Sequence, residues 1–267
     1  SPKGLEALNE RLRYISHYPD VTNDDVMNTI ADVYGIEKDS ILLGNGAAEL
    51  LYAVGRLSGF TGAFVPAPGF SEYQASMDAA NIPVREIFYR QRQNDDGTPY
   101  FEVPYLALQT FAAELKGQDG RIIVFLGNPN NPDGTLLDKQ SIKVLAQMLK
   151  DANSLLVIDE SFIDFIGNES LRDNSHSMRE LINQYDNVII VHSFTKFYAV
   201  PGLRIGAVFA NPTLIQELRQ YIPAWSVNTL AQAYTESALT DTKYINDSKM
   251  VLANEAKYMY ESLSAIK

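Results

Sequence analysis

The sequence of 267 residues predicts an α/β fold, in which a mostly parallel sheet is covered by helices on both faces. Short apolar runs rich in β-branched residues alternate along the chain with longer segments whose apolar positions have helical spacing. A helix predicted over residues 137–153 lies between the runs 121–126 and 154–158, and it returns the chain antiparallel to the strands. Polar residues follow several of the runs, and open α/β sheets bind ligands beyond the carboxyl ends of their strands.

The elements follow in chain order. Residues 4–14 are predicted as a helix from their apolar spacing, and residues 22–34 as a second helix, capped by Thr22 or Asn23 and closed at Gly35. Short buried runs are predicted over residues 40–43, 62–66, 84–89, 121–126, 154–158, 187–191 and 206–210. Further helices are predicted through Arg56, from Gly69, over 110–116, 137–153 and 213–219, and over most of 229–267 with a break at Thr240 and Asp241. The polar stretch 91–99 is predicted to be a surface loop without chemistry.

Composition and charge exclude several classes of function. Hydrophobic residues make up 46% of the chain, which is ordinary for a globular protein, and the net charge of −11 argues against a nucleic-acid partner. The chain has no cysteine, which excludes disulfides and thiolate metal sites and fits a reducing compartment such as the cytoplasm. The three histidines are scattered, so we expect no histidine metal site. No apolar run approaches the roughly 20 residues that a membrane span needs, and no signal peptide is evident.

The stretch around Lys196 holds the first candidate for chemistry. Lys196 lies just past the strand predicted over 187–191, with Ser193 and Thr195 beside it and Arg204 eight positions later. A lysine amine can form a Schiff base with an aldehyde, and arginine and hydroxyl groups suit phosphate oxygens. A solvated surface lysine is the ordinary alternative for such a residue when it is considered alone.

Residues 193–206 resemble the lysine segment of fold-type I pyridoxal-phosphate enzymes, the class I and II aminotransferases, because S-x-T-K is followed by G-L-R-I-G. The string T-K-F-Y-A-V-P-G-L-R is most similar to the threonine-phosphate decarboxylases of cobalamin synthesis, whose relatives are the histidinol-phosphate aminotransferases. Five motifs occur in the family's order over essentially the whole chain. The resemblance implies a three-layer α-β-α sandwich with a mixed, mostly parallel sheet, a pyridoxal 5'-phosphate cofactor and a homodimer.

The resemblance also implies the residues that hold the cofactor. Lys196 would bind it covalently and serve as acid or base. The phosphate would be held by side chains after the lysine strand and by backbone at the turn into the next predicted helix, namely Ser193, Thr195, Arg204, Gly46, Ala47 and Ala48. Without the family, the turn at Gly46 is equally well explained as a tight connection.

Three further residues are assigned to the cofactor ring by the resemblance. Phe70, after a predicted strand, would stack on the ring, with Tyr73 packing behind it; an ordinary core phenylalanine is the alternative. Asn131, in N-P-N-N-P-D-G, would donate to the phenolic oxygen. Asp159 would pair with the pyridine nitrogen, although a helix cap or salt bridge would also explain an acid at a strand end. Phe162 stands where many relatives have tyrosine, and we expect it only to pack.

Two aromatic positions lie outside these motifs. Tyr18, in Y-P-D, would reach the cofactor phosphate of the partner subunit if the family's dimer is formed; packing on a loop is the alternative. The segment with the only tryptophan, P-x-W-x-V-N, is typical of the decarboxylase branch, so Trp225 and Asn228 are candidates for the substrate side.

The chain is expected to divide into residues 1–21, an N-terminal helix and dimer-contacting segment, residues 22–235, the cofactor-binding large domain, and residues 236–267, a helix leading to a small C-terminal domain that is largely absent. No residue can be given the role of the arginine that grips the substrate carboxylate. We expect decarboxylation of L-threonine O-3-phosphate to (R)-1-aminopropan-2-yl phosphate. The alternatives are an aminotransferase of the histidinol-phosphate type and a domain that binds without turnover.

Overall fold

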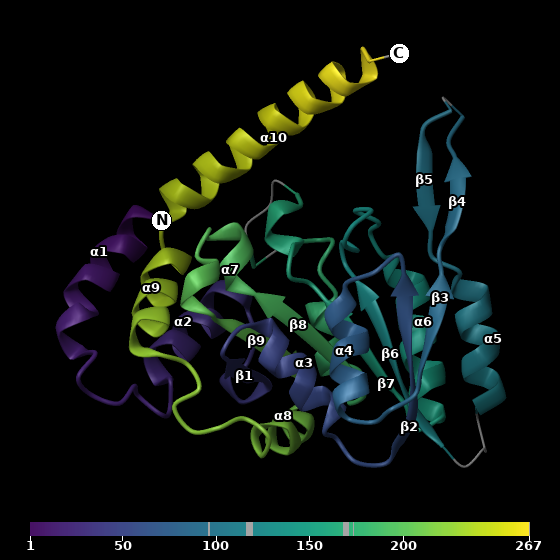
Figure 1. The fold of residues 1–267 in the computed structure, drawn as a ribbon, viewed down its shortest axis with the longest axis horizontal. Coiled ribbons are helices and arrows are strands. Elements are labelled where there is room, and N and C mark those ends of the chain that lie inside the picture. Colours follow the sequence, from purple (N-terminus) through teal and green to yellow (C-terminus); the bar gives the residue numbers. More distant parts are fainter. Residues whose placement is uncertain (96, 116–119, 168–170, 173, 267) are drawn as a thin grey trace.

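The computed structural model describes residues 1–95, 97–115, 120–167, 171–172 and 174–266 (Figure 1). Within them, seven strands form one sheet in the order β1-β9-β8-β7-β6-β2-β3. Their bounds are β1 Ile41–Gly44, β2 Phe60–Ala67, β3 Val84–Phe88, β6 Arg121–Gly127, β7 Leu155–Asp159, β8 Val188–Ser193 and β9 Gly206–Ala210. Only β9 runs antiparallel to its neighbours, which are β1 and β8. The predicted mixed, mostly parallel sheet is therefore confirmed.

Helices cover both faces of this sheet (Figure 1). Their bounds are α1 Pro2–Arg11, α2 Asp24–Tyr34, α3 Ala47–Gly55, α4 Ser71–Ala79, α5 Tyr105–Leu115, α6 Lys139–Asp151, α7 Phe194–Phe197, α8 Pro212–Arg219, α9 Thr229–Leu239 and α10 Thr242–Ser264. The central strands are buried throughout, and successive residues point to opposite faces. In β7, for example, Leu156 and Ile158 join one core cluster, whereas Leu155 and Val157 join the other.

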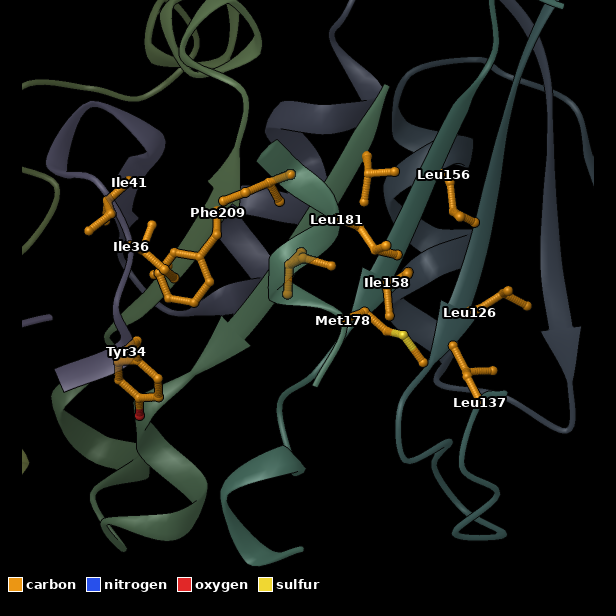
Figure 2. Packing of buried hydrophobic residues seen from close by; sticks show 14 of the residues in the cluster. Tyr34, Ile36, Ile41, Leu126, Leu137, Leu156, Ile158, Met178, Leu181 and Phe209 are labelled. Carbon is orange, nitrogen blue, oxygen red and sulfur yellow. The ribbon is translucent and has the colours of Figure 1, made fainter. Parts of the chain in front are cut away.

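The two core clusters fix the three-layer arrangement. One cluster packs the sheet against α3, α4 and α8. The other packs it against α2, α5, α6 and the short 3₁₀ helix η4 Arg179–Asn183, and Figure 2 shows Met178 and Leu181 of this cluster beside Ile158 of β7. Burying a large aliphatic side chain contributes about 1.5–3 kcal/mol, so these two interfaces supply most of the stability that holds the strand ends in place.

The stretch 91–99 lies at the surface as predicted, but the prediction of a loop was wrong for residues 91–93 and 99, which belong to strands. Strands β4 Arg90–Gln93 and β5 Pro99–Glu102 form an antiparallel hairpin that projects from the body (Figure 1). Every β4 side chain is exposed, so the run lacks the apolar alternation by which a strand is recognised. The hairpin is held by the backbone ladder and by an ion pair between Arg92 Nε and Glu102 Oε2 at 2.9 Å. Residue 96, at its tip, lies outside the described residues.

The start of α2 also differs from expectation. The predicted caps do not act, because Asn23 has a left-handed backbone (φ 57°) and its side chain makes no capping hydrogen bond. Asp20 takes this place instead: its carboxylate accepts from the Thr22 and Asp24 N–H groups at 3.0 and 3.2 Å. The predicted closure at Gly35 is confirmed, since Gly35 adopts φ 67°.

The C-terminal part of the chain consists of two helices that meet at the predicted break. Helix α9 ends at Leu239, and Asp241 caps α10 by accepting from the Tyr244 N–H at 3.2 Å. Beyond its base α10 extends away from the body, on the same side as the β4–β5 hairpin (Figure 1). Among the helices that the structure describes, none has the length and apolarity of a membrane span.

Candidate active site

The predicted motifs meet at one edge of the sheet. Asp159, the last residue of β7, lies opposite Val191 of the neighbouring parallel strand β8, and Lys196 follows β8 in α7. On the other side of β8, Ser193 pairs with Gly206 of β9, which in turn pairs with Gly44 at the end of β1. Residues from four separate stretches of sequence are thus brought together by strand pairing alone.

Lys196 is the exposed residue of a turn whose other residues are buried. Phe194, Thr195 and Phe197 are at most 4% exposed, so the turn is anchored on three sides while the lysine side chain is free to reach a ligand. The Lys196 Nζ lies 5.7 Å from the centroid of the Phe162 ring. Phe162 therefore does more than pack, because the face of its ring is close enough to attract the ammonium group.

The turn between β1 and α3 can hold an anion together with Arg204. Gly46 has φ +83°, which residues with a Cβ rarely adopt, and a Cβ there would lie 2.9 Å from the Arg204 Cζ, so a larger residue would displace the guanidinium. The Gly46 N–H is already used, since it donates to the Gly44 carbonyl at 2.8 Å. Ala47 and Ala48 open α3, where N–H groups have no partner within the helix.

Two hydroxyl groups complete the candidate phosphate site at the β1–α3 turn. The Oγ atoms of Ser193 and Thr195 lie 2.8 Å apart, and both residues are nearly buried. Gly206 brings β9 close to the start of α3, because a Cβ on it would lie 2.9 Å from the Ala47 Cα. Two hydroxyls, an exposed guanidinium and the end of a helix form a donor set that suits a phosphate, so the residues fit the expected cofactor.

Asp159 is held ready for a cationic partner. It is 7% exposed; its Oδ2 accepts from the Tyr73 hydroxyl at 2.9 Å and its Oδ1 from the Ser161 N–H at 2.9 Å. Burial, followed by the charge of Asp159, raises the pKa of Tyr73 well above its usual range, so the phenol stays protonated and donates. A pyridinium nitrogen would supply the positive charge that a buried carboxylate needs.

The other two acids of this segment have structural partners. Glu160 accepts from Ser177 Oγ at 2.6 Å, from the Met178 N–H at 2.6 Å and from Asn128 Nδ2 at 3.0 Å, and burial raises its pKa. Asp164 accepts from the Tyr34 hydroxyl at 2.7 Å and lies 3.2 Å from His192 Nε2. Burial alone would raise the pKa of Asp164, but His192, Tyr34 and Arg179 together hold it below its usual value. Glu160 and Asp164 are thus engaged in the fold, and the pairing of Asp159 with the cofactor ring stays a prediction.

Tyr73 is the functional candidate that the sequence did not reveal. As predicted, it packs behind Phe70: the two rings meet edge to face, with centroids 5.6 Å apart, and Tyr73 also stacks on Phe125 of β6 at 5.4 Å. Its hydrogen bond to Asp159 was not foreseen. The sequence held one indication of this role. Tyr73 follows Phe70, the N-cap of α4, by three positions, a spacing that puts the two side chains on the same side of the helix.

The loop after β6 contains three asparagines, two of which hydrogen-bond within the protein through their side-chain amides. Asn128 donates to Glu160 and to the His176 carbonyl, and Asn130 donates to the Pro68 carbonyl at 3.0 Å and to Asp133. Asn130 thereby ties this loop to the loop that carries Phe70. The Asn131 side chain makes no hydrogen bond within the described part of the chain, so its amide is the one available to a ligand.

Tyr18 and Trp225 form an exposed aromatic pair. Their ring centroids lie 4.7 Å apart, and Tyr18 is 80% exposed. Trp225 has a left-handed backbone (φ 60°), and the following Ser226 donates to Glu49 of α3. Asn228 is used structurally, because it donates to the Leu203 carbonyl at 2.9 Å and caps α9. Of the two candidates for the substrate side, only Trp225 thus presents an uncommitted side chain.

One hollow of the surface lies well away from these residues. It measures about 530 Å³ and is found at the opposite edge of the sheet, where β6 and β7 begin at Arg121 and Leu155. Three of its charged groups are engaged, since Arg121 donates to the Asn153 carbonyl at 2.7 Å and Lys150 pairs with Asp186 at 2.9 Å. The convergence of motifs, rather than the size of a hollow, identifies the candidate site.

Comparison with known proteins agrees with this geometry. The family described as aminotransferase class I and II matches residues 2–267. The chain is 34% identical to the adenosylcobalamin biosynthesis bifunctional protein CobDQ of Leptospira interrogans, over 91% of this chain and 26% of that protein. It is 30% identical to a putative threonine-phosphate decarboxylase of Caldanaerobacter subterraneus, over 94% of this chain and 64% of that protein. The chain therefore spans about a quarter of the first relative and less than two thirds of the second.

A solved structure shares the fold over the whole chain. The histidinol-phosphate aminotransferase from Clostridium acetobutylicum superposes with a TM-score of 0.84 at 25% identity, covering 100% of this chain and 74% of that one. The resemblance seen in residues 193–206 and the expected fold are thereby confirmed, and pyridoxal phosphate is the cofactor that these findings support. The chain belongs to the aminotransferase class I and II family.

Proposed function

We propose that this chain carries the cofactor site of a pyridoxal-phosphate-dependent enzyme that decarboxylates L-threonine O-3-phosphate to (R)-1-aminopropan-2-yl phosphate, a reaction of cobalamin biosynthesis. The relatives at 34% and 30% identity have names of this branch, and the string T-K-F-Y-A-V-P-G-L-R supports the same assignment. The observation that carries the cofactor assignment is the meeting of Lys196, the Asp159–Tyr73 pair and the Gly46–Arg204 turn at one sheet edge.

In this proposal, each part of the site has one task. Lys196 would hold the cofactor through its amine, and the free amine would then move protons at the substrate carbon. Asp159 would pair with the protonated pyridine nitrogen, and the Tyr73 hydroxyl and the Ser161 N–H orient the carboxylate for this contact. When bound, pyridoxal phosphate supplies an electron sink for the carbanion that loss of carbon dioxide leaves behind.

The remaining residues orient the ligand. The Ser193 and Thr195 hydroxyls, the Arg204 guanidinium and the N–H groups of Ala47 and Ala48 would donate to the cofactor phosphate, with Gly46 giving room for Arg204. In addition, Phe70 would cover one face of the cofactor ring, and Asn131 would donate to its phenolic oxygen. Phe162 has no hydroxyl with which to share that role.

A homodimer is also proposed. Tyr18 is 80% exposed and lies on this chain's own Trp225, so it is placed to reach a neighbouring molecule. In the dimer it would contact the cofactor phosphate of the partner subunit. The cytoplasmic location expected from the sequence stays a prediction.

An aminotransferase of the histidinol-phosphate type is the second candidate, and the TM-score of 0.84 with such an enzyme favours it. The two reactions differ in the bond that breaks at the substrate carbon: the bond to the carboxylate in the decarboxylase, the bond to hydrogen in the aminotransferase. A cofactor-binding domain without turnover is the third candidate.

The test is to supply the full-length protein, loaded with pyridoxal phosphate, with each substrate separately. We expect O-phosphothreonine to release carbon dioxide in equal amount to (R)-1-aminopropan-2-yl phosphate, measured by mass spectrometry. Transfer of the amino group from histidinol phosphate to 2-oxoglutarate, without release of carbon dioxide from O-phosphothreonine, would instead establish the aminotransferase. Turnover of neither substrate would contradict both.

A further inference from the structure

The turn that carries Lys196 cannot be stable by itself. Helix α7 is four residues long, and a single helical turn gains too few hydrogen bonds to offset the entropy of ordering it. Two of its carbonyls are satisfied locally: Thr195 O accepts from the Val200 N–H and Lys196 O from the Ala199 N–H, both at 3.1 Å. Contacts from outside the turn must therefore supply the rest of its stability.

The next two carbonyls accept hydrogen bonds from tyrosines far away in sequence. Phe197 O accepts from the Tyr244 hydroxyl at 2.9 Å, and Tyr198 O accepts from the Tyr234 hydroxyl at 3.0 Å. Tyr234 belongs to α9 and Tyr244 to the first turn of α10. Both phenols act on the residues directly after Lys196, at the end of the turn where helix carbonyls lack partners within the helix.

Packing reinforces these two hydrogen bonds. The Tyr244 ring stacks on Tyr198, with centroids 6.1 Å apart and planes at 24°, and meets the Phe197 ring edge to face at 6.2 Å. Tyr234 is 1% exposed, and Gly4 of α1 lies so close that a Cβ there would meet its ring at 2.7 Å. Neither tyrosine can leave its carbonyl without disturbing its packing.

Helix α10 is attached to the body mainly at its base. None of its described residues is fully buried, and Tyr244 and Ile245 are its members that pack against the core. All described residues from 250 to its end are exposed. A change in the direction of α10 would therefore shift Tyr244, which contacts the turn that carries Lys196 directly.

We propose that Tyr244, with Tyr234 as its companion, is a positioning residue for Lys196 that links the direction of α10 to the placement of the lysine amine. The proposal rests on Lys196 being the residue that binds the cofactor. Neither phenol touches the reacting atoms; both act by holding the carbonyl end of the turn. This role makes α10 a structural part of the site even though its described residues from 250 onward are exposed.

The test uses Tyr244→Phe and Tyr234→Phe, which remove the hydroxyl and keep the ring, and Tyr258→Phe as the matched control on the exposed part of α10, where the side chain is 66% exposed. Three quantities are measured in the full-length protein: the rate at which added pyridoxal phosphate becomes covalently attached, the pH midpoint of the bound cofactor's absorbance change, and the melting temperature. Borohydride reduction and peptide mass spectrometry of the wild type establish that Lys196 is the attachment residue.

We expect Tyr244→Phe to slow attachment about fivefold, the factor that corresponds to one net hydrogen bond, and to move the pH midpoint. Tyr234→Phe should act in the same direction, and Tyr258→Phe should match the wild type. Attachment rate and midpoint equal to those of Tyr258→Phe in both variants would overturn the proposal, even if melting temperatures fall. Attachment at a lysine other than Lys196 in the wild type would overturn the proposed cofactor site as well, and is seen before any variant is compared.

Discussion

Replacing Tyr73 by phenylalanine isolates the hydrogen bond that supports Asp159. The change removes one hydroxyl and leaves the ring in its packing between Phe70 and Phe125, so no large cavity forms. The lost bond is 2.9 Å long, both partners are at most 7% exposed, and the acceptor carries charge. Hydrogen bonds of this kind contribute about 1.5–3 kcal/mol.

The Ser161 N–H still binds Oδ1 in this variant, so Asp159 remains oriented but less strongly held. If the full free energy of this hydrogen bond stabilises the transition state, kcat/KM for O-phosphothreonine should fall about 10- to 150-fold, since about 1.4 kcal/mol is a factor of ten. The assay is steady-state release of carbon dioxide, together with a titration of the apo-protein by pyridoxal phosphate. Tyr185→Phe, at a half-buried tyrosine just before the start of β8, is the control.

The reasoning would be refuted if Tyr73→Phe and Tyr185→Phe had the same kcat/KM and the same affinity for the cofactor. A fall in melting temperature with unchanged kinetics would mean that the hydroxyl serves only the fold. A large loss of activity in Tyr73→Phe with cofactor affinity preserved would place the effect in the reaction rather than in binding.

Three further predictions concern other parts of the structure. Gly46→Ala should weaken cofactor binding at least tenfold, because its Cβ displaces the Arg204 guanidinium, and inorganic phosphate should compete less well in the same titration. Asp164→Asn should lower the free energy of unfolding by about 3–5 kcal/mol in urea titrations, since it breaks the buried contact with His192, while Lys38→Ala, at an exposed pair, should change it by less than about 1 kcal/mol. Tyr105 has a pKa raised to about 12 by burial, so the folded state keeps a proton that the unfolded state loses above pH 10; stability should therefore fall between pH 10 and 12, and less steeply in Tyr105→Phe.

The site could be predicted from sequence where a motif lies next to a strand end. Lys196, Asp159 and Arg204 each directly follow or flank a recognisable buried run, and strand pairing then brings them together. Parallel strands present their carboxyl ends at one edge, which places Asp159 and Lys196 together, but the resemblance to a known family was needed to assign these residues to one site.

Contacts between elements distant in sequence could not be predicted in this way. The bond from Tyr73 to Asp159 depends on how α4 packs across β6 and β7, which no local pattern contains. The same holds for Tyr244, whose carbonyl partner is 47 positions earlier. The β4–β5 hairpin was missed for a different reason: its strands are exposed, so hydrophobic alternation, the signal of a half-buried strand, is missing.

The most direct measurement is the site of covalent attachment. Pyridoxal phosphate is added to the full-length protein and to Lys196→Ala, both are reduced with borohydride, and the labelled peptide is identified by mass spectrometry. The account predicts one label, on Lys196, in the wild type and none in Lys196→Ala. A label at another lysine, or equal labelling of the two proteins, would contradict it.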